Sequence, residues 1–387
     1  MSEFQASNFK KAQGGGAPDI VGKVEFTSPY FFVPPSGTTA ERPQSCAPGT
    51  IRFNTDVGTL EVYKGDTIGW EYIQKREGQY LGGGTGSNTG TGTRGIFTSR
   101  STSPGVYANT TDFITISTLG DAQDFGDTIG TGAYGATTSD NTRGLLGGGH
   151  PNSNGSDTIQ FFTIAQQGNA TDFGNLTSAR WLMGGGCSNS TRSIFTAGST
   201  LGSGNPAVNT LDYVTTQSLG NAVDFGDSGK RRMQASVNSS TRSIWAGGYD
   251  HPAEAANDTI EFVTTATLGD TTDFGNLTVA SRSMAGVCNS TRGAFGGNGN
   301  PLTNVIQFIT IATTGDAIDF GDLSSARQLG GGASSPTRGV FAGGYTPSSL
   351  NTIDFIEILT TGNGTDFGDL TVASYGMGGI SNGHGGL

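Results

Sequence analysis

One repeated pattern runs from about residue 79 to the end of the chain and limits the folds that it can adopt. A Thr-Arg pair recurs six times, with spacings of 49, 49, 50, 50 and 46 residues. An Asp-Phe-Gly triplet recurs six times at a similar interval. Two independent markers with one period of about 49 residues indicate a repeat protein, in which each repeat is one supersecondary unit. The arginines are Arg94, Arg143, Arg192, Arg242, Arg292 and Arg338, and the aspartates are Asp124, Asp172, Asp224, Asp273, Asp319 and Asp366.

Each repeat divides into four short segments of strand-like composition. The first is small and Gly-rich, the second follows the arginine, the third alternates Thr with apolar residues, and the fourth begins at Asp-Phe-Gly. The β-branched and aromatic residues of these segments favour strands over helices. A Gly followed by Asp or Asn stands four residues before every Asp-Phe-Gly. This spacing predicts a tight turn between antiparallel third and fourth strands.

Four antiparallel strands in a repeat of this length predict an all-β fold, a β-propeller of about six four-stranded blades in residues 79–387. The innermost strands of a propeller crowd round its axis, which accounts for the Gly-rich first segments. These segments occur seven times and the others six times, so the ring would close by combining strands from both ends of the repeat region. The Gly-Gly pairs after the second segments loosely resemble the glycine doublet of kelch-type repeats. A linear solenoid is the alternative.

The repeated charges predict structural roles, because a catalytic pair is needed once and not six times. We expect the six arginines and six aspartates to bond to backbone or to each other; a ring of ligand sites lining the channel is the alternative. No EF-hand or nonapeptide spacing indicates calcium, and we expect no metal and no cofactor. A polar residue precedes the aromatic of each third strand and is expected on a solvated or hydrogen-bonded face: Asp112, Gln160, Asp212, Glu261, Gln307 and Asp354.

Composition argues against several classes of function. The formal charge is −11 and the chain has no basic run, which disfavours nucleic-acid binding through phosphates. The longest apolar stretch is shorter than the roughly 18 residues of a membrane-spanning helix. Three cysteines and three histidines, none at ligand spacing, disfavour a zinc site. The common catalytic motifs are lacking, so we expect no enzyme. Cys187 and Cys288 are assigned to the same place in two repeats, as small buried side chains.

Differences between the repeats predict a binding face. The connection between the second and third strands varies in length and composition. Because these connections share one place in the blade, they should share one face. Variable loops on a rigid scaffold are a usual location of binding residues, and aromatic side chains there can stack on sugar rings. The candidate ligand-binding residues are Tyr107, His150, Tyr249, Asp250, His251 and Tyr345.

The first 78 residues differ from the repeats. Residues 1–32 are polar and are expected to be flexible on their own and to order against a partner. Residues 33–78 predict a small β-hairpin, because apolar residues alternate with polar ones in two runs separated by turn residues. Trp70 follows these runs and is expected to cap their apolar face. The apolar residues of the two runs are Ile51, Phe53, Leu60 and Val62.

This N-terminal segment resembles a known module. The string PSGTTAERP, followed by GTIRFNTDVGTLEVY and a Trp, is similar to a module of fibre and appendage proteins in tailed phages. The repeats are similar to repeat regions of fibre-like proteins in marine cyanobacterial phages. Glu41 and Thr50 depart from the Gln and Met usual in the module. The resemblance implies a virion attachment module, an outward-facing domain and no catalytic residues. The segment that it implies in docking on other virion proteins contains Phe31, Phe32, Pro34, Pro35, Arg42, Arg52, Phe53 and Trp70.

The leading hypothesis is a phage virion protein (a tail fibre, neck or other appendage) that docks through its N-terminus and binds a host-surface glycan or protein through its propeller. A connector or decoration protein without a host ligand is the second hypothesis, and a cellular kelch-like interaction module is another. A polysaccharide depolymerase needs a carboxylate pair, and in the variable loops the unique acids are Asp250 and Glu254. Phage fibres are often trimers, but no heptad pattern enforces a trimer here.

Overall fold

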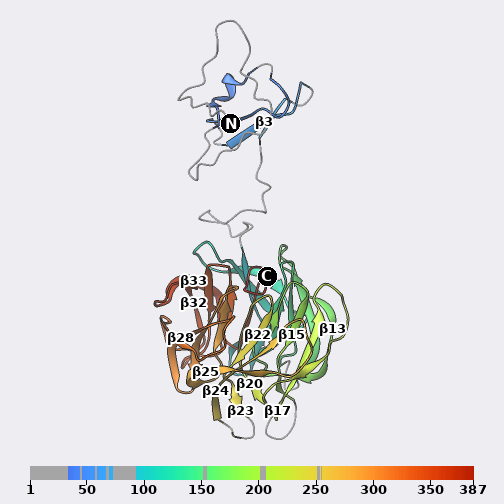
Figure 1. Cartoon of the computed structure of the whole chain (residues 1–387), viewed down its shortest axis with the longest axis vertical. Helices are drawn as coiled ribbons and strands as arrows, with labels where there is room; N and C mark the ends of the chain where they lie inside the picture. Colours follow the sequence, from blue (N-terminus) through green and yellow to red (C-terminus); the bar gives the residue numbers. More distant parts are fainter. Residues whose placement is uncertain are drawn as a thin grey trace, which may run out of the picture. The chain divides into compact units, whose positions relative to one another are not determined.

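The computed structural model describes residues 34–43, 46–56, 59–66, 69–72, 93–150, 155–200, 206–250, 253 and 255–387. The chain divides into two compact units, Met1–Lys75 and Arg76–Leu387, both built from β-strands (Figure 1). Among the described residues the only helical element is one 3-10 turn, η1 (Thr39–Glu41). No helix of the described part could therefore cross a membrane. The expected boundary between residues 78 and 79 lies outside the described residues.

The N-terminal unit is one four-stranded sheet with the order β1-β2-β3-β4. Strand β1 is parallel to β2, and the other neighbours are antiparallel. The predicted hairpin is thus the centre of a slightly larger sheet. Its strands are β1 (Ser36–Gly37), β2 (Ile51–Asn54), β3 (Thr59–Tyr63) and β4 (Trp70–Tyr72).

The C-terminal unit contains six antiparallel sheets, numbered here in chain order. Sheet 1 holds β34 (Gly378–Ser381), β5 (Arg94–Thr98), β8 (Thr110–Thr115) and β9 (Gln123–Asp127). Sheet 2 holds β10 (Ala136–Ser139), β11 (Arg143–Gly147), β12 (Ser156–Thr163) and β13 (Thr171–Arg180). Sheet 3 holds β14 (Cys187–Ser188), β15 (Arg192–Phe195), β18 (Thr210–Thr215) and β19 (Val223–Asp227).

The remaining sheets repeat the same strand order. Sheet 4 holds β21 (Ala235–Asn238), β22 (Arg242–Ala246), β24 (Ala255–Thr264) and β25 (Thr272–Ser281), and is extended by β20 (Arg231–Arg232) and β23 (Tyr249–Asp250). Sheet 5 holds β26 (Ala285–Cys288), β27 (Arg292–Gly299), β28 (Leu302–Thr310) and β29 (Ile318–Asp322). Sheet 6 holds β30 (Gly331–Ser334), β31 (Arg338–Ala342), β32 (Leu350–Glu357) and β33 (Thr365–Ser374). Two small hairpins join β6 (Arg100–Ser103) to β7 (Val106–Ala108) and β16 (Gly198–Ser199) to β17 (Ala207–Val208).

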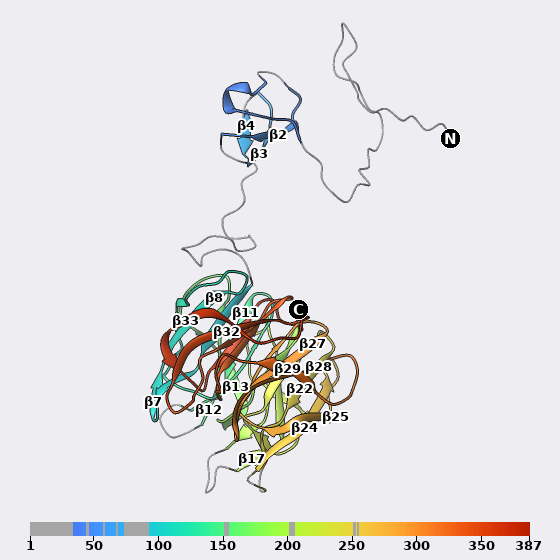
Figure 2. The same ribbon diagram turned by 90° about the vertical axis from the view of Figure 1, so that its left-hand side faces the viewer.

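The six sheets follow one another in a closed cycle. Each first strand contacts the first strand of the next sheet, and β34 contacts both β30 and β10. The hydrophobic core consists of six clusters, each between one sheet and the next, including one between sheets 6 and 1. Figure 2 shows β32 and β33, from the end of the chain, beside β8 from the beginning of the unit. Sheet 1 therefore combines strands from both ends of the repeat region, as the strand count predicts.

Glycine occupies the first strands because these strands approach one another closely. A Cβ at Gly286 would overlap the carbonyl oxygen of Ser236, one at Gly332 that of Gly286, and one at Gly379 that of Gly332. Each obstacle is a backbone atom, so no change of side-chain rotamer can relieve the overlap. The crowding that the Gly-rich segments predict is thus present where the six first strands meet.

Each arginine of the Thr-Arg pairs ties its own sheet to the next one. Arg192, for example, donates a hydrogen bond of 2.9 Å to the carbonyl oxygen of Thr265, just after the third strand of sheet 4. Its guanidinium also lies over the ring of Tyr213 on its own third strand, 4.6 Å from the centroid. The same two contacts recur at all six arginines, the last of which reaches back to sheet 1. Such contacts are structural.

The six aspartates of the Asp-Phe-Gly triplets differ from the expectation that they bond to backbone or to the arginines. Their side chains are exposed, and no ion pair among the described residues joins them to the six arginines. Strand alternation gives the reason. The adjacent Phe is buried, as Phe125 is against Phe113 with ring centroids 5.7 Å apart, so the neighbouring Asp points to solvent.

Candidate functional site

One end of the ring carries a narrow annulus of backbone hydrogen bonds. The annulus lies on the connections that lead into the six first strands. Each connection contributes one residue with a positive φ, between 46° and 67°. The backbone N–H of this residue, or in one connection that of the next residue, donates to the carbonyl oxygen of the corresponding residue in the preceding connection. The six hydrogen bonds form a closed cycle with lengths of 2.7 to 3.1 Å. The annulus residues are Tyr134, Leu182, Met233, Ser283, Leu329 and Gly376.

Five of these six annulus residues are not glycine, although left-handed backbone favours glycine. Each such residue costs on the order of 1 kcal/mol and persists only where the surrounding structure determines it. Strain of this kind concentrates at binding sites and switches. The annulus and the adjoining connections between second and third strands, called here the axial loop face, are therefore the candidate site.

Buried ion pairs position the connections of this face. Four sheets pair a third-strand acid with a buried arginine, whereas in sheets 2 and 5 the third strand carries glutamine instead. Each of these six side chains also accepts a backbone N–H of the preceding sheet, as Asp212 does from Thr177 at 2.9 Å. Of the two predicted environments for these polar residues, solvated or hydrogen-bonded, the structure shows the hydrogen-bonded one. Five of the six side chains are buried, because the preceding sheet covers them. The four pairs are Arg100–Asp112, Arg180–Asp212, Arg231–Glu261 and Arg327–Asp354.

Aromatic side chains form a continuous row on one half of the axial loop face. The centroid distances along the row are 4.9 Å for Tyr345–Tyr375, 6.4 Å for Tyr375–Tyr134, 6.5 Å for Tyr134–Trp181, 4.6 Å for Trp181–His150 and 5.0 Å for His150–Tyr107. Within the row Tyr375 is buried, and the other five residues are partly exposed. This aromatic group offers ring faces and polar tips at one surface.

The environment of the aromatic group keeps His150, Tyr107 and Tyr134 neutral near pH 7. Burial lowers the pKa of His150 below its ordinary value. Burial and the neighbouring Tyr375 raise the pKa of Tyr107 and of Tyr134. A neutral imidazole and neutral phenols can donate and accept hydrogen bonds and can stack on apolar ligand surfaces.

Arginine takes the place of the aromatic residues on the other half. The residue just before the annulus residue is Trp181 in one connection, Tyr375 in another, but Arg232 and Arg282 in two consecutive connections. Both guanidinium groups lie against the ring of Tyr249, with centroid distances of 4.9 Å for Arg232 and 4.5 Å for Arg282. We call Arg232, Tyr249 and Arg282 the arginine–tyrosine group.

The structure distributes the predicted ligand-binding residues over both halves. Tyr107, His150 and Tyr345 belong to the aromatic group, and Tyr249 belongs to the arginine–tyrosine group. Asp250 is adjacent to Tyr249 in β23, where its backbone pairs with Arg231. His251 and Glu254 lie outside the described residues.

Sequence reasoning missed several residues of this face. Tyr134, Trp181 and Tyr375 stand in the connections into the first strands, just before the Gly-rich segments. Arg282 was not singled out either. The sequence did contain a sign of these residues. Large side chains recur just before the Gly-rich segments, and because a crowded inner strand has no space for them, they indicate residues of the preceding connection.

The opposite end of the ring is covered by the segment around His384. Each first strand ends in a small polar residue that bonds to a neighbouring first strand. His384 Nε2 lies 2.9 Å from the carbonyl oxygen of Ser139, while Nδ1 accepts from Asn238 Nδ2 and Gly386 N at 3.1 Å each. An axial cavity of about 120 Å³ lies between this end and the annulus. The six polar residues are Ser139, Ser188, Asn238, Cys288, Ser334 and Ser381.

The acid stability of this end gives a test. Burial lowers the pKa of His384 to about 4, and two N–H donors already occupy the face of Nδ1 that protonation would need. The pKa of a histidine in the unfolded chain is about 6.5. The contribution of neutral His384 to the free energy of unfolding is therefore fully present above pH 6.5, and about 2 to 3 kcal/mol of it is lost as the pH falls toward 4. Urea unfolding at pH 7 and 4.5 should show this loss in the wild type and not in His384→Gln. A ring pKa near 6.5 by NMR would contradict it.

The two buried cysteines do not share one place in their repeats. Cys187 pairs with Ile194, two residues after Arg192, whereas Cys288 pairs with Gly293, one residue after Arg292. They are therefore one register apart and point to opposite faces of their strands. Cys187 joins the core between sheets 3 and 4, whereas Cys288 belongs to the core between sheets 4 and 5 and also lines the axial cavity. Both are small buried side chains, as expected, and burial raises the pKa of each thiol.

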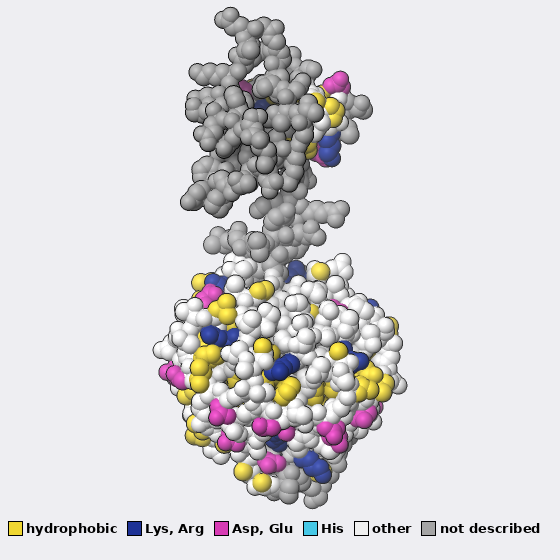
Figure 3. All heavy atoms as spheres, in the orientation of Figure 1, with side chains coloured by type: hydrophobic (Ala, Val, Ile, Leu, Met, Phe, Trp, Pro, Cys, Tyr) yellow, Lys and Arg dark blue, Asp and Glu magenta, His cyan; other side chains and the backbone are white. Residues whose placement is uncertain are grey.

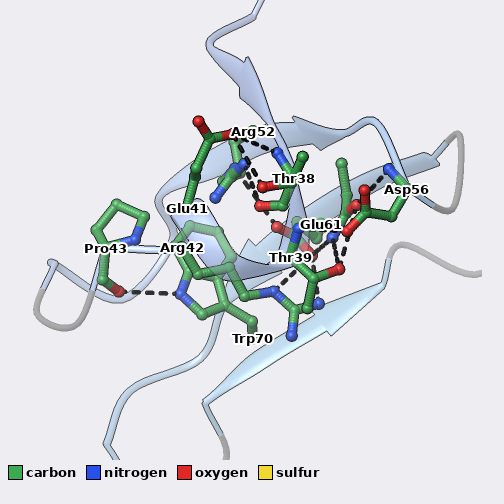
Figure 4. Close-up of polar contacts among 10 residues, drawn as sticks. Thr38, Thr39, Glu41, Arg42, Pro43, Arg52, Asp56, Glu61 and Trp70 are labelled. Carbon is green, nitrogen blue, oxygen red and sulfur yellow. Dashed lines mark hydrogen bonds and ion pairs between the residues drawn. The ribbon is translucent and has the colours of Figure 1, made fainter.

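The N-terminal unit uses its charged residues to hold its own fold (Figure 4). Glu61 is fully buried and accepts hydrogen bonds from Arg42, at 2.6 and 3.0 Å, and from Asn54 at 3.0 Å. Arg52 lies 3.4 Å from the same carboxylate and donates to the carbonyl of Thr38. Burial opposes ionisation of Glu61, but these donors hold its pKa below the ordinary value. Arg42 and Arg52 are thus engaged within the unit.

The position of Trp70 differs from the prediction. Trp70 lies beside Tyr63, with ring centroids 5.4 Å apart, and donates to the carbonyl of Pro43. It is paired with Tyr63 across the sheet and so shares the face of Glu61. The apolar face on the other side remains open, since Ile51 is 47% exposed and Leu60 is 37% exposed. The other residues predicted to dock on virion proteins are placed as follows. Phe53 is partly buried on this apolar face, Pro34 is partly buried and Pro35 is exposed. Phe31 and Phe32 lie outside the described residues.

No protein-family model matches the chain, and no curated protein matches it. On the face of the C-terminal unit that Figure 3 shows, hydrophobic, basic and acidic side chains are interspersed.

Proposed function

We propose that residues 93–387 form a six-bladed β-propeller in a virion appendage protein of a tailed phage, such as a tail fibre or neck protein. In this proposal the propeller binds a host-surface carbohydrate through its axial loop face. The closed cycle of first-strand contacts and the six inter-sheet cores support the propeller. The N-terminal string that resembles phage fibre modules supports the virion assignment.

The aromatic group is the observation that carries the binding function. A pyranose ring has apolar C–H faces and a rim of hydroxyls. A partly exposed row of aromatic rings with phenol and imidazole tips matches both features, because the rings stack and the tips form hydrogen bonds. The six sheets hold the row in place through the strained annulus, so little ordering cost is expected on binding.

The direction of the chain suits a presented binding face. The described part of the C-terminal unit begins beside the His384 end, where Arg94 N donates to Asn382 at 2.8 Å. The axial loop face is the other end of the ring, and Figure 1 shows β17, β20 and β23 at the end away from the C-terminus. The axial loop face thus lies at the end of the ring opposite to the first described residues of this unit. The N-terminal unit would attach through its open apolar face of Ile51, Phe53, Leu60 and Val62.

A binding experiment on the full chain tests this function. A panel of bacterial surface polysaccharides is immobilised and binding is measured for the wild type, Trp181→Ala and Tyr345→Ala. We expect the wild type to bind at least one polysaccharide and each variant to lose at least about tenfold in affinity, as central aromatic residues of interfaces do. Phe53→Ala removes a partly exposed aromatic residue of the other unit and should bind as the wild type does. Equal binding by Trp181→Ala would count against the proposal.

A further inference from the structure

The two halves of the axial loop face differ in charge. The residues that precede the annulus residues are Ala133, Trp181, Arg232, Arg282, Gln328 and Tyr375. Going round the axis, three consecutive connections carry the aromatic group and the next two carry the arginines. The repeated backbone thus presents aromatic rings on one side of the axis and guanidinium groups on the other. A ligand that covers the axis would meet both.

Arg282 keeps donors available. A guanidinium that stacks on an aromatic ring still presents its N–H groups in its own plane, where they match the oxygens of a carboxylate or sulfate. Arg282 is partly exposed and contacts Tyr249. An oxyanion at this surface can therefore meet the edge of the guanidinium while the tyrosine ring supports its face.

Charge distinguishes this half of the face from the aromatic half. Arg231, beside this group, is paired with Glu261, whereas Arg282 is partly exposed and lies against the ring of Tyr249. A partly exposed guanidinium attracts anions in a chain whose formal charge is −11. The carboxylate of Asp250, which follows Tyr249 in the chain, opposes this attraction.

We infer that the arginine–tyrosine group binds the carboxylate or sulfate groups of an acidic polysaccharide whose sugar rings stack on the aromatic group. This inference rests on the proposed carbohydrate binding and names the class of carbohydrate. Arg282 supplies the in-plane donors, Tyr249 holds its guanidinium, and Trp181 and Tyr345 supply the stacking faces. The sugar backbone fixes the distance between the anionic and apolar contacts, so a neutral polymer would engage one half only.

The test measures binding of the full chain to three immobilised polymers: polygalacturonate, dextran sulfate and neutral dextran. We expect tighter binding to at least one acidic polymer than to dextran. Arg282→Gln keeps most of the stem that packs on Tyr249 and should lower the acidic affinity about tenfold, while Asp250→Asn should raise it about threefold. Lys64→Gln makes the same charge change on the N-terminal unit and should leave binding unchanged.

The outcomes separate the two proposals. Equal affinity for acidic and neutral polymers, or wild-type binding by Arg282→Gln, overturns the inference even if Trp181→Ala abolishes binding, in which case the proposed function stands. Loss of acidic binding in Arg282→Gln with no effect of Trp181→Ala keeps the anion site and overturns the stacking function. A preference for one acidic polymer decides between carboxylate and sulfate. Binding to none of the three polymers overturns the inference.

Discussion

Replacement of Arg180 by serine is expected to lower the free energy of unfolding by about 3 to 5 kcal/mol, because it leaves a charged carboxylate buried without its counter-ion. Arg180 and Asp212 are both completely buried, and their ion pair joins sheet 2 to sheet 3. Asp212→Gln should cost a similar amount, since it leaves the guanidinium unpaired. Urea unfolding monitored by the β-sheet signal measures both changes.

The chain itself contains a neutral version of this site. Between sheets 4 and 5 the position of Arg180 is taken by Ser281 of sheet 4, and that of Asp212 by Gln307 of sheet 5. The Oε1 atom of Gln307 accepts from the N–H and hydroxyl of Thr278 at 2.8 and 2.9 Å. The double variant Arg180→Ser, Asp212→Gln copies this arrangement into sheets 2 and 3. It should therefore recover at least half of the stability that either single variant loses, which a double-mutant cycle measures.

An exposed pair provides the control. Arg338 and Glu357 form an ion pair in which the Glu357 side chain is half exposed, so Glu357→Gln should change the stability by less than about 0.5 kcal/mol. If the double variant were as unstable as the sum of its single variants, the burial of unpaired charge would not be the cause of the loss.

These ion pairs also show where sequence reasoning stops. In the third strands, Asp212 and its equivalents alternate with the apolar core residues and so point to the other face of the sheet. This alternation suggested a solvated or hydrogen-bonded face. The face is buried because the preceding sheet in the ring covers it, and a single strand carries no sign of this. The sequence does hold an indirect sign. Arg180 and Arg327 stand eight residues after the Asp of their Asp-Phe-Gly triplets, and each pairs with an acid on the next third strand. Where the residue at this spacing is Ser281, the next third strand carries Gln307 in place of an acid.

The fold was more predictable than the site because it repeats. Six copies of one hairpin turn and seven of one Gly-rich segment average out local ambiguity. The closure of the ring through both ends of the repeat region followed from counting these segments. The candidate site depends on positions that do not repeat, such as Trp181, Arg282 and Tyr375. The register of Cys187 was misassigned for a related reason, since its distance to the following arginine is five residues and that of Cys288 is four.

The N-terminal unit illustrates the limit of an alternation argument. Alternation placed Ile51, Phe53, Leu60 and Val62 on one face, and the strand register agrees. Alternation alone could not tell which face Trp70 covers, because that depends on how β4 pairs with β3. Trp70 faces Tyr63 in that register, and it packs over the polar side that Glu61 organises.

The largest loss after the ion pair is expected from Gly332→Ala, which should lower the free energy of unfolding by about 3 kcal/mol or more. The added methyl group would overlap the carbonyl oxygen of Gly286, which belongs to the backbone of the neighbouring first strand. That strand is confined in turn, because Gly286 lies against Ser236 and Gly332 lies against Gly379. The ring could accept the methyl group only by moving sheets 5 and 6 apart.

A matched substitution separates this crowding from the general effect of replacing glycine. Gly130 lies in an exposed connection, has ordinary φ, and would meet nothing within 4 Å of an added Cβ. Gly130→Ala should therefore be neutral or slightly stabilising. Gly379→Ala adds a second test, since Gly379 belongs to β34, the strand that closes sheet 1 from the other end of the chain. Gly379→Ala should speed amide hydrogen exchange in β34 and β5 before it does so elsewhere. If Gly332→Ala proved as stable as Gly130→Ala, the first strands would not be closely packed and the prediction would be wrong.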